Sequence, residues 1–88
     1  MGKFKQGTHA LSFSTKEYPA FSDRLKIAMQ IRNCSVAELA ASSYVTKSAI
    51  CGYRSGHRSP DIIILRAIAE SLDVSADFLL GLREDIYI

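Results

Sequence analysis

Apolar residues recur every three or four positions along most of this chain, the interval that places side chains on one face of a helix. Five segments after residue 20 show this interval, and short polar stretches separate them. The first carries an apolar stripe made of Phe21, Leu25, Ala28 and Met29. The pattern therefore predicts five helices, each with one face turned toward a common core.

Residues that favour helix ends lie at the borders of these segments. Ser22 is a candidate for the start of the first helix, because a serine oxygen can accept a hydrogen bond from a backbone N–H group of the first turn. The other predicted borders are Asn33 at the end of that helix, Asp61 or Ser59 before a helix from about Ile62 to Leu72, and Ser75 and Gly81 around the last helix.

Residues 35 to 56 are the most informative stretch. Ser35 and Glu38 have the spacing of a capping box, in which each side chain accepts from the backbone N–H group of the other residue. Thr46 can start a second helix, and Gly56 supplies the left-handed residue that ends it. A helix, a turn of about three or four residues and a second helix form the helix-turn-helix unit, which places its second helix in the DNA major groove. The residues of that helix predicted to face the core are Ala49, Ile50 and Tyr53.

Two apolar segments outside the helices are not explained by this pattern. In the leader, Leu11 and Phe13 alternate with polar residues, which indicates a short strand or an extended arm. The tail, residues 86–88, is apolar as well, and Ile63 lies away from the inward stripe of its helix. Together they indicate a second apolar surface, which is either a contact between leader and tail or a subunit interface. We favour the interface.

Length and composition narrow the class of protein. Eighty-eight residues, with 48% hydrophobic and 23% charged, indicate one small globular domain with a marginal core. No apolar run approaches the roughly 18 residues that span a membrane. The first residues contain no secretory signal, so we expect a cytoplasmic protein.

The side chains do not form a pattern typical of a catalytic or metal site. Cys34 and Cys51 lack metal-ligand spacing, and the two histidines lie far apart in the sequence. There is no glycine-rich phosphate loop and no inward pair of carboxylates. We therefore expect no enzyme activity, no metal, no cofactor and no small-molecule ligand.

Charge is distributed unevenly along the chain. The net charge of +2 is too small to indicate a partner. From Asp61 onward, however, six acidic residues outnumber two basic ones, while the stretch between Glu38 and Asp61 contains no acidic residue. We interpret that stretch as a phosphate-facing surface; the alternative is an ordinary solvated face. Its basic residues and its histidine are Lys47, Arg54, His57 and Arg58.

The five segments, in this order and at this spacing, resemble the Cro/cI-like, or xenobiotic-response-element-like, helix-turn-helix regulators. The resemblance implies an all-α, five-helix, lambda-repressor-like DNA-binding domain over residues 21–82, between a non-helical leader (1–20) and a tail (83–88). It also implies a transcriptional regulator that binds double-stranded operator DNA as a homodimer, and we expect a repressor. The segments that carry the resemblance are FSDRLKIAM, SVAELA, TKSAI, YRSGHRSPD and LRAIAESLDVSADFLLG.

The resemblance also implies a set of DNA contacts. Its recognition helix falls on residues from about Thr46 to Arg54, with base contacts at Lys47 and Ser48 and, one turn on, at Gly52. Thr46 falls where the family often contacts a phosphate. The remaining expected backbone contacts are Val36 at the start of the preceding helix, and Arg54, Ser55, His57 and Arg58 at the far end of the recognition helix and beyond it.

The chain departs from the family pattern at four places. Val36 replaces a frequent glutamine, so only backbone N–H groups remain there for a phosphate. Tyr44 replaces the turn glycine; because a bulky residue at positive φ is unfavourable, we expect a different bend, with the ring filling space left by Ser43. Met29 and Arg54 replace an Arg–Glu pair, so we expect no stranded buried charge and an Arg54 that is free to face phosphate.

The fourth departure is Gly52, which costs about 1 kcal/mol of helix stability relative to alanine. Because it has no side chain, Lys47 and Ser48 are the only base-reading side chains that we expect. This favours moderate sequence specificity and a large electrostatic share of the affinity.

A second interpretation keeps the fold but changes the partner. The domain could be a protein-interaction module, such as an antitoxin-like or anti-repressor partner. Val36, Tyr44, Gly52 and the apolar tail would then be adaptations to a protein surface.

Overall fold

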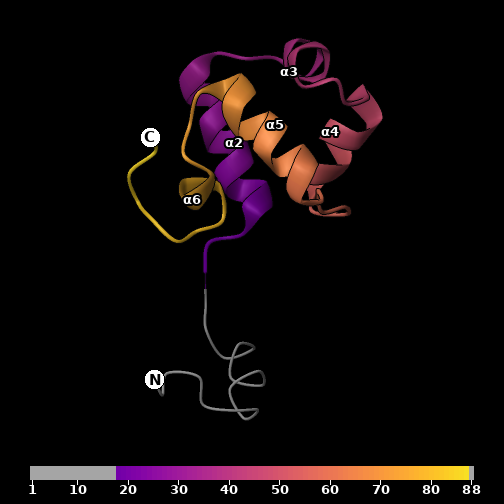
Figure 1. Ribbon diagram of the computed structural model, residues 1–88. Coiled ribbons are helices and arrows are strands. Elements are labelled where there is room, and N and C mark those ends of the chain that lie inside the picture. Colours follow the sequence, from indigo (N-terminus) through magenta and orange to yellow (C-terminus); the bar gives the residue numbers. More distant parts are fainter. Residues whose placement is uncertain (1–17, 88) are drawn as a thin grey trace.

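The computed structural model describes residues 18–87 and contains five helices (Figure 1). The described residues contain no strand, and none of their helices is long and apolar enough to cross a membrane. The predicted all-helical, five-helix architecture is confirmed, whereas the strand or arm predicted around Leu11 and Phe13 lies outside the described residues. The helices are α2 (Phe21–Arg32), α3 (Val36–Ser43), α4 (Lys47–Ser55), α5 (Ile62–Leu72) and α6 (Ala76–Leu79).

Every helix contributes at least one completely buried side chain to a single core. Burying one such aliphatic side chain contributes roughly 1.5–3 kcal/mol, so no helix is held by its backbone alone. Helix α2 runs through the centre of the domain and packs against α4, α6 and α5, while α3 packs against α4 and α5. The fully buried residues, one from each helix in chain order, are Leu25, Leu39, Ile50, Ile68 and Leu79.

The predicted capping of α3 is confirmed by its hydrogen bonds. The Glu38 N–H group donates to Ser35 Oγ at 3.1 Å, and the Ser35 N–H group donates to Glu38 Oε1 at 2.9 Å. Asp61 and Ser75 accept in the same way from the first turns of α5 and α6. The predicted caps Ser35 and Ser75 are confirmed, and Asp61 is the cap of the two alternatives, Asp61 and Ser59, because each cap depends on residues only two or three positions apart.

The start of α2 is not the predicted one. Ser22 lies inside the helix, which begins at Phe21 after Ala20, and no side chain caps it. Instead, the Ala20 carbonyl accepts from the N–H groups of Asp23 and Arg24, both at 3.1 Å. An earlier start lets the Phe21 ring pack against the core, and this tertiary contact outweighs the local preference of serine for the cap.

The turn between α3 and α4 also differs from the prediction. Tyr44 adopts the left-handed conformation of a turn glycine, with φ 60°, and its ring is 95% exposed instead of filling a space. Ser43 leaves no gap, because it is itself buried and its hydroxyl donates to the Leu39 carbonyl at 2.6 Å. The bend lets the Val45 N–H group donate to the Ala40 carbonyl at 3.1 Å. The left-handed conformation of Tyr44 lowers the stability of the folded state by about 1–2 kcal/mol.

The C-terminal tail packs on its own domain. Ile86 is buried in the core, and its carbonyl accepts from the Ser75 N–H group at 2.8 Å. Arg24, a buried residue of α2, donates to Glu84 Oε2 at 3.1 Å and to the Arg83 carbonyl at 3.2 Å. The expectation that Ile86 helps to form a subunit interface is therefore wrong, since its side chain already lies in the core of its own chain.

Candidate nucleic-acid interface

Helix α4 has one buried and one open face. Ala49, Ile50 and Tyr53 face the core, as predicted, and hold the helix against α2 and α3. The residues between them project to the other side, at the three- and four-residue intervals of a single helix face. We call this surface the α4 face; it consists of the exposed residues Lys47, Ser48, Cys51 and Ser55.

The first turn of α4 is capped at the backbone and has exposed side chains. The Ala49 N–H group donates to Thr46 Oγ1 at 3.1 Å, which confirms the predicted cap. Lys47 and Ser48 follow directly, and both are exposed. The cap therefore holds the backbone of two side chains that can reach a partner, and no other described segment covers them.

The start of α3 offers backbone groups instead of a side chain. Val36 is half-buried and packs against the core, so its side chain does not project from the helix. The N-terminal end of a helix nevertheless attracts anions, because its first N–H groups have no partner within the helix. Among the family positions expected to contact phosphate, this one can act only through the backbone.

The segment after α4 turns back along the helix. Gly56 takes the left-handed conformation with φ 85° and ends α4, as predicted. The N–H groups of His57 and Arg58 then both donate to the Gly52 carbonyl, at 3.0 and 3.2 Å. Ser55 Oγ and His57 Nδ1 lie 2.8 Å apart in a hydrogen bond, which leaves the exposed side chains of this segment beside the last turn of α4.

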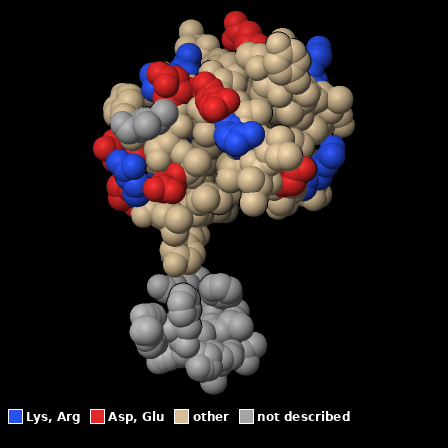
Figure 2. All heavy atoms as spheres, viewed as in Figure 1, with Lys and Arg blue, Asp and Glu red and all other residues tan. Residues whose placement is uncertain are grey.

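The charge of the surface follows the distribution along the sequence. Helix α4 and the segment after it contain no acidic residue, and their basic side chains are Lys47, Arg54 and Arg58. On the face shown in Figure 2, most acidic atoms lie toward α6 and the tail, away from the side on which α4 lies in Figure 1. Helix α4 and the segment after it therefore present donors and positive charge and have no carboxylate of their own.

Comparison with known proteins agrees with this geometry. The helix-turn-helix family model matches residues 25–79, well over half of the chain. The chain is a Cro/cI-like helix-turn-helix protein. Its fold is also similar to the crystal structure of the restriction-modification controller protein C.AhdI from Aeromonas hydrophila, with 25% identity over 67% of this chain and 89% of that chain and a TM-score of 0.65. No curated protein matches the sequence.

Membership of the helix-turn-helix family supports a DNA-binding transcriptional regulator. The α4 face lies on the second helix of the helix-turn-helix unit. Two residues of helix α4 need a different description from the one expected from sequence. Gly52 is not open, because the Arg58 side chain lies across it. Cys51, which the sequence analysis did not include among the expected DNA contacts, is the exposed residue one turn after Lys47 and Ser48. Cys51 follows Lys47 by four positions and Ser48 by three, and this helical spacing could have placed it on the same face from the sequence.

The replaced Arg–Glu pair behaves only partly as expected. Met29 is buried in the core, so it strands no charge on α2. Arg54, however, is half-buried, and within the described part of the chain its Nε has no hydrogen-bond partner. A buried N–H group left without a partner costs about 1–3 kcal/mol. Arg54 is therefore less free to reach a phosphate than its sequence position suggests.

Proposed function

We propose that this helix-turn-helix protein is a sequence-specific transcriptional regulator that inserts α4 into the DNA major groove. The observation that carries the proposal is the α4 face: Lys47 and Ser48 project from a capped first turn in a stretch without acidic residues. A helix about 10–12 Å across fits a major groove about 12 Å wide. The similarity to a restriction-modification controller protein also supports a regulatory role.

Three side chains of the α4 face would read bases. The Lys47 ammonium would donate to guanine O6 or N7, and the Ser48 hydroxyl can pair with either kind of base. Cys51 adds a small side chain on the same face, of a size that suits contact with a thymine methyl group. Contacts from only three side chains distinguish few base pairs, so we propose moderate sequence specificity.

The remaining contacts would go to the phosphate backbone and supply most of the affinity. Each neutralised phosphate adds about 0.9 to the slope of log affinity against log salt concentration. The proposed phosphate contacts are the backbone at Val36, the hydroxyls of Thr46 and Ser55, and the side chains of Arg54, His57 and Arg58.

We propose repression as the regulatory mode. A domain that occupies an operator excludes other proteins from the same stretch of duplex. This mode requires only binding, which the α4 face supports.

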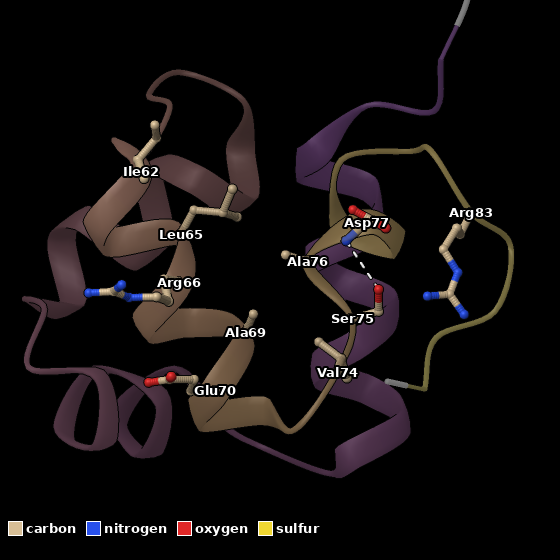
Figure 3. A pocket seen from close by; sticks show the side chains of 10 residues that line it. All are labelled: Ile62, Leu65, Arg66, Ala69, Glu70, Val74, Ser75, Ala76, Asp77 and Arg83. Atoms are coloured by element: carbon tan, nitrogen blue, oxygen red, sulfur yellow. Dashed lines mark hydrogen bonds between the residues drawn. The ribbon is translucent and has the colours of Figure 1, made fainter.

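We also propose that the protein acts as a homodimer joined through α5 and α6. A hollow of about 510 Å³ lies between these helices, and Leu65, Ala69 and Val74 line its apolar part (Figure 3). Ile62, which also lines the hollow, and its neighbour Ile63 are 81% and 69% exposed, which is unusual for two adjacent isoleucines. We call these five residues the α5–α6 face.

Charge complementarity favours a second copy as the occupant of this face. Both signs occur around the hollow, so a two-fold arrangement would bring the bases of one copy to the acids of the other. Helix α5 packs against α2, α3 and α6 but not against α4, so pairing here would leave α4 open in both copies. Two recognition helices about 34 Å apart would then read half-sites separated by one turn of duplex. The charged residues around the hollow are Arg66, Glu70, Asp77 and Arg83.

A salt titration of duplex binding tests the regulator proposal. We expect affinity to fall steeply and linearly on a log–log scale as salt rises, with an operator selected from random duplexes retaining an advantage over other sequences. If about 1 µM protein at low salt binds no duplex, the protein-interaction module becomes the better interpretation.

A further inference from the structure

The Arg58 side chain is held against the side of α4. Its backbone N–H group donates to the Gly52 carbonyl at 3.2 Å, as does that of His57 at 3.0 Å, so the segment after the helix is anchored to the helix itself. Farther along the side chain, Arg58 Cζ lies 5.8 Å from the centre of the Tyr53 ring. The arginine thus lies along α4 instead of pointing away from the loop.

This position depends on the missing side chain of Gly52. A Cβ atom on Gly52 would lie 2.6 Å from Arg58 Cδ, 3.0 Å from Cγ and 3.3 Å from Cβ. The optimal separation of two non-bonded carbons is about 3.5–4.0 Å, and a Cβ atom essentially never lies within 3.0 Å of another heavy atom. Because the close contact extends along three consecutive carbons, starting at the one attached to the backbone, rotation at the far end of the arginine cannot relieve it.

The backbone of Gly52 does not itself require glycine. It lies inside α4, and the glycines with positive φ among the described residues are Gly56 and Gly81. A glycine in a helix interior weakens the helix relative to alanine. Close approach of another group is the remaining physical reason for glycine at this position, and Arg58 is the group that approaches.

We infer that Gly52 is a positioning residue, which keeps the Arg58 guanidinium beside α4, where it binds a DNA phosphate. The inference rests on the proposed DNA-binding function. Gly52 itself makes no side-chain contact with DNA; it acts by letting the arginine stem lie flat on the helix. Any larger residue would push the stem outward and move the charge away from the phosphate.

A double-mutant cycle tests this inference in the full-length chain. Gly52→Ala, Arg58→Ala and the double variant are compared with the wild type by titration of an operator duplex at several salt concentrations. We expect each single variant to bind on the order of tenfold more weakly at 0.1 M salt, with a salt slope smaller by about 0.9. The double variant should bind no more weakly than Arg58→Ala, because the two residues serve one contact.

Thermal unfolding separates positioning from damage to the fold. In the Arg58→Ala background, Gly52→Ala should raise Tm by about 4–8 °C, because alanine is the better helix former and no arginine obstructs it. A variant that is at least as stable as its parent and still loses affinity cannot owe that loss to unfolding.

Two results would overturn the inference, and they differ from each other. If wild type binds duplex but Gly52→Ala leaves affinity and salt slope unchanged, or adds its full effect to that of Arg58→Ala, the positioning role is wrong and the regulator proposal stands. If the wild type binds no duplex, the proposed function fails, and the positioning role fails with it.

Discussion

The α4 face and the α5–α6 face lie on helices whose backbones do not approach each other closely, and the two faces differ in shape and charge. The α4 face consists of short or flexible side chains on a capped helix, and none of them is acidic. The α5–α6 face is an apolar hollow with an exposed isoleucine, Ile62, in its lining, a second, Ile63, next to it, and charges of both signs around it. We propose that the first surface binds the polyanionic DNA backbone and groove, and that the second binds another copy of the same chain.

The largest expected effect concerns the α5–α6 face. Ile62→Glu places an unpaired carboxylate in each half of the proposed dimer, so we expect dimer affinity to fall at least 100-fold, about 2.7 kcal/mol. Because Ile62 is mostly exposed in one chain, the fold of the monomer should be unaffected. Sedimentation equilibrium measures the change, and Ile31→Glu, at an exposed isoleucine of α2, is the matched control. Equal sedimentation of wild type and Ile62→Glu would remove this face from the proposed dimer.

The next effect concerns the α4 face. Lys47→Ala should reduce discrimination between operator and random duplex by about 1–3 kcal/mol, because it removes a donor to guanine. Competition binding with both duplexes measures the difference. The dimer affinity should not change, since α4 and α5 do not pack together. An equal loss on both duplexes would make Lys47 a phosphate contact only.

The smallest expected effect concerns two residues with positive φ, one next to each face. Tyr44 precedes α4 and Asp73 ends α5, and both have positive φ, of 60° and 56°. Tyr44→Gly should raise the free energy of unfolding by about 1 kcal/mol, because glycine adopts this conformation without strain. Asp73→Gly should gain less, because a short polar side chain tolerates the left-handed region better. Urea unfolding measures both, and a Tyr44→Gly variant no more stable than wild type would show that the turn carries no strain.

The parts of the molecule that sequence predicts correctly depend on neighbouring residues. The capping box of Ser35 and Glu38, the Thr46 cap and the left-handed Gly56 are each decided within a few positions, and helical spacing was enough to assign Ile50 to the core. The same locality explains why the helix-turn-helix unit could be recognised before its packing was known.

The features that sequence missed are set by contacts between distant residues. Ser22 is a good cap by type, but packing of Phe21 moves the helix start. Arg24 is charged and yet buried, because its partner Glu84 comes from a tail 60 residues away along the chain. The Arg58 side chain covers Gly52 because the loop turns back on α4. The spacing of residues along a helix does not predict such a turn.

Protection of Cys51 from alkylation would test most directly whether the α4 face enters the groove. Cys51 is an exposed residue of that face, whereas Cys34 is half-buried, and burial together with the nearby Glu38 carboxylate raises the pKa of its thiol and slows its reaction at neutral pH. We expect saturating operator duplex to slow maleimide labelling of Cys51 at least tenfold, because DNA packed against the α4 face would exclude the reagent from the thiol. The labelling rate of Cys34 should not change. Equal labelling of Cys51 with and without bound duplex would contradict insertion of α4.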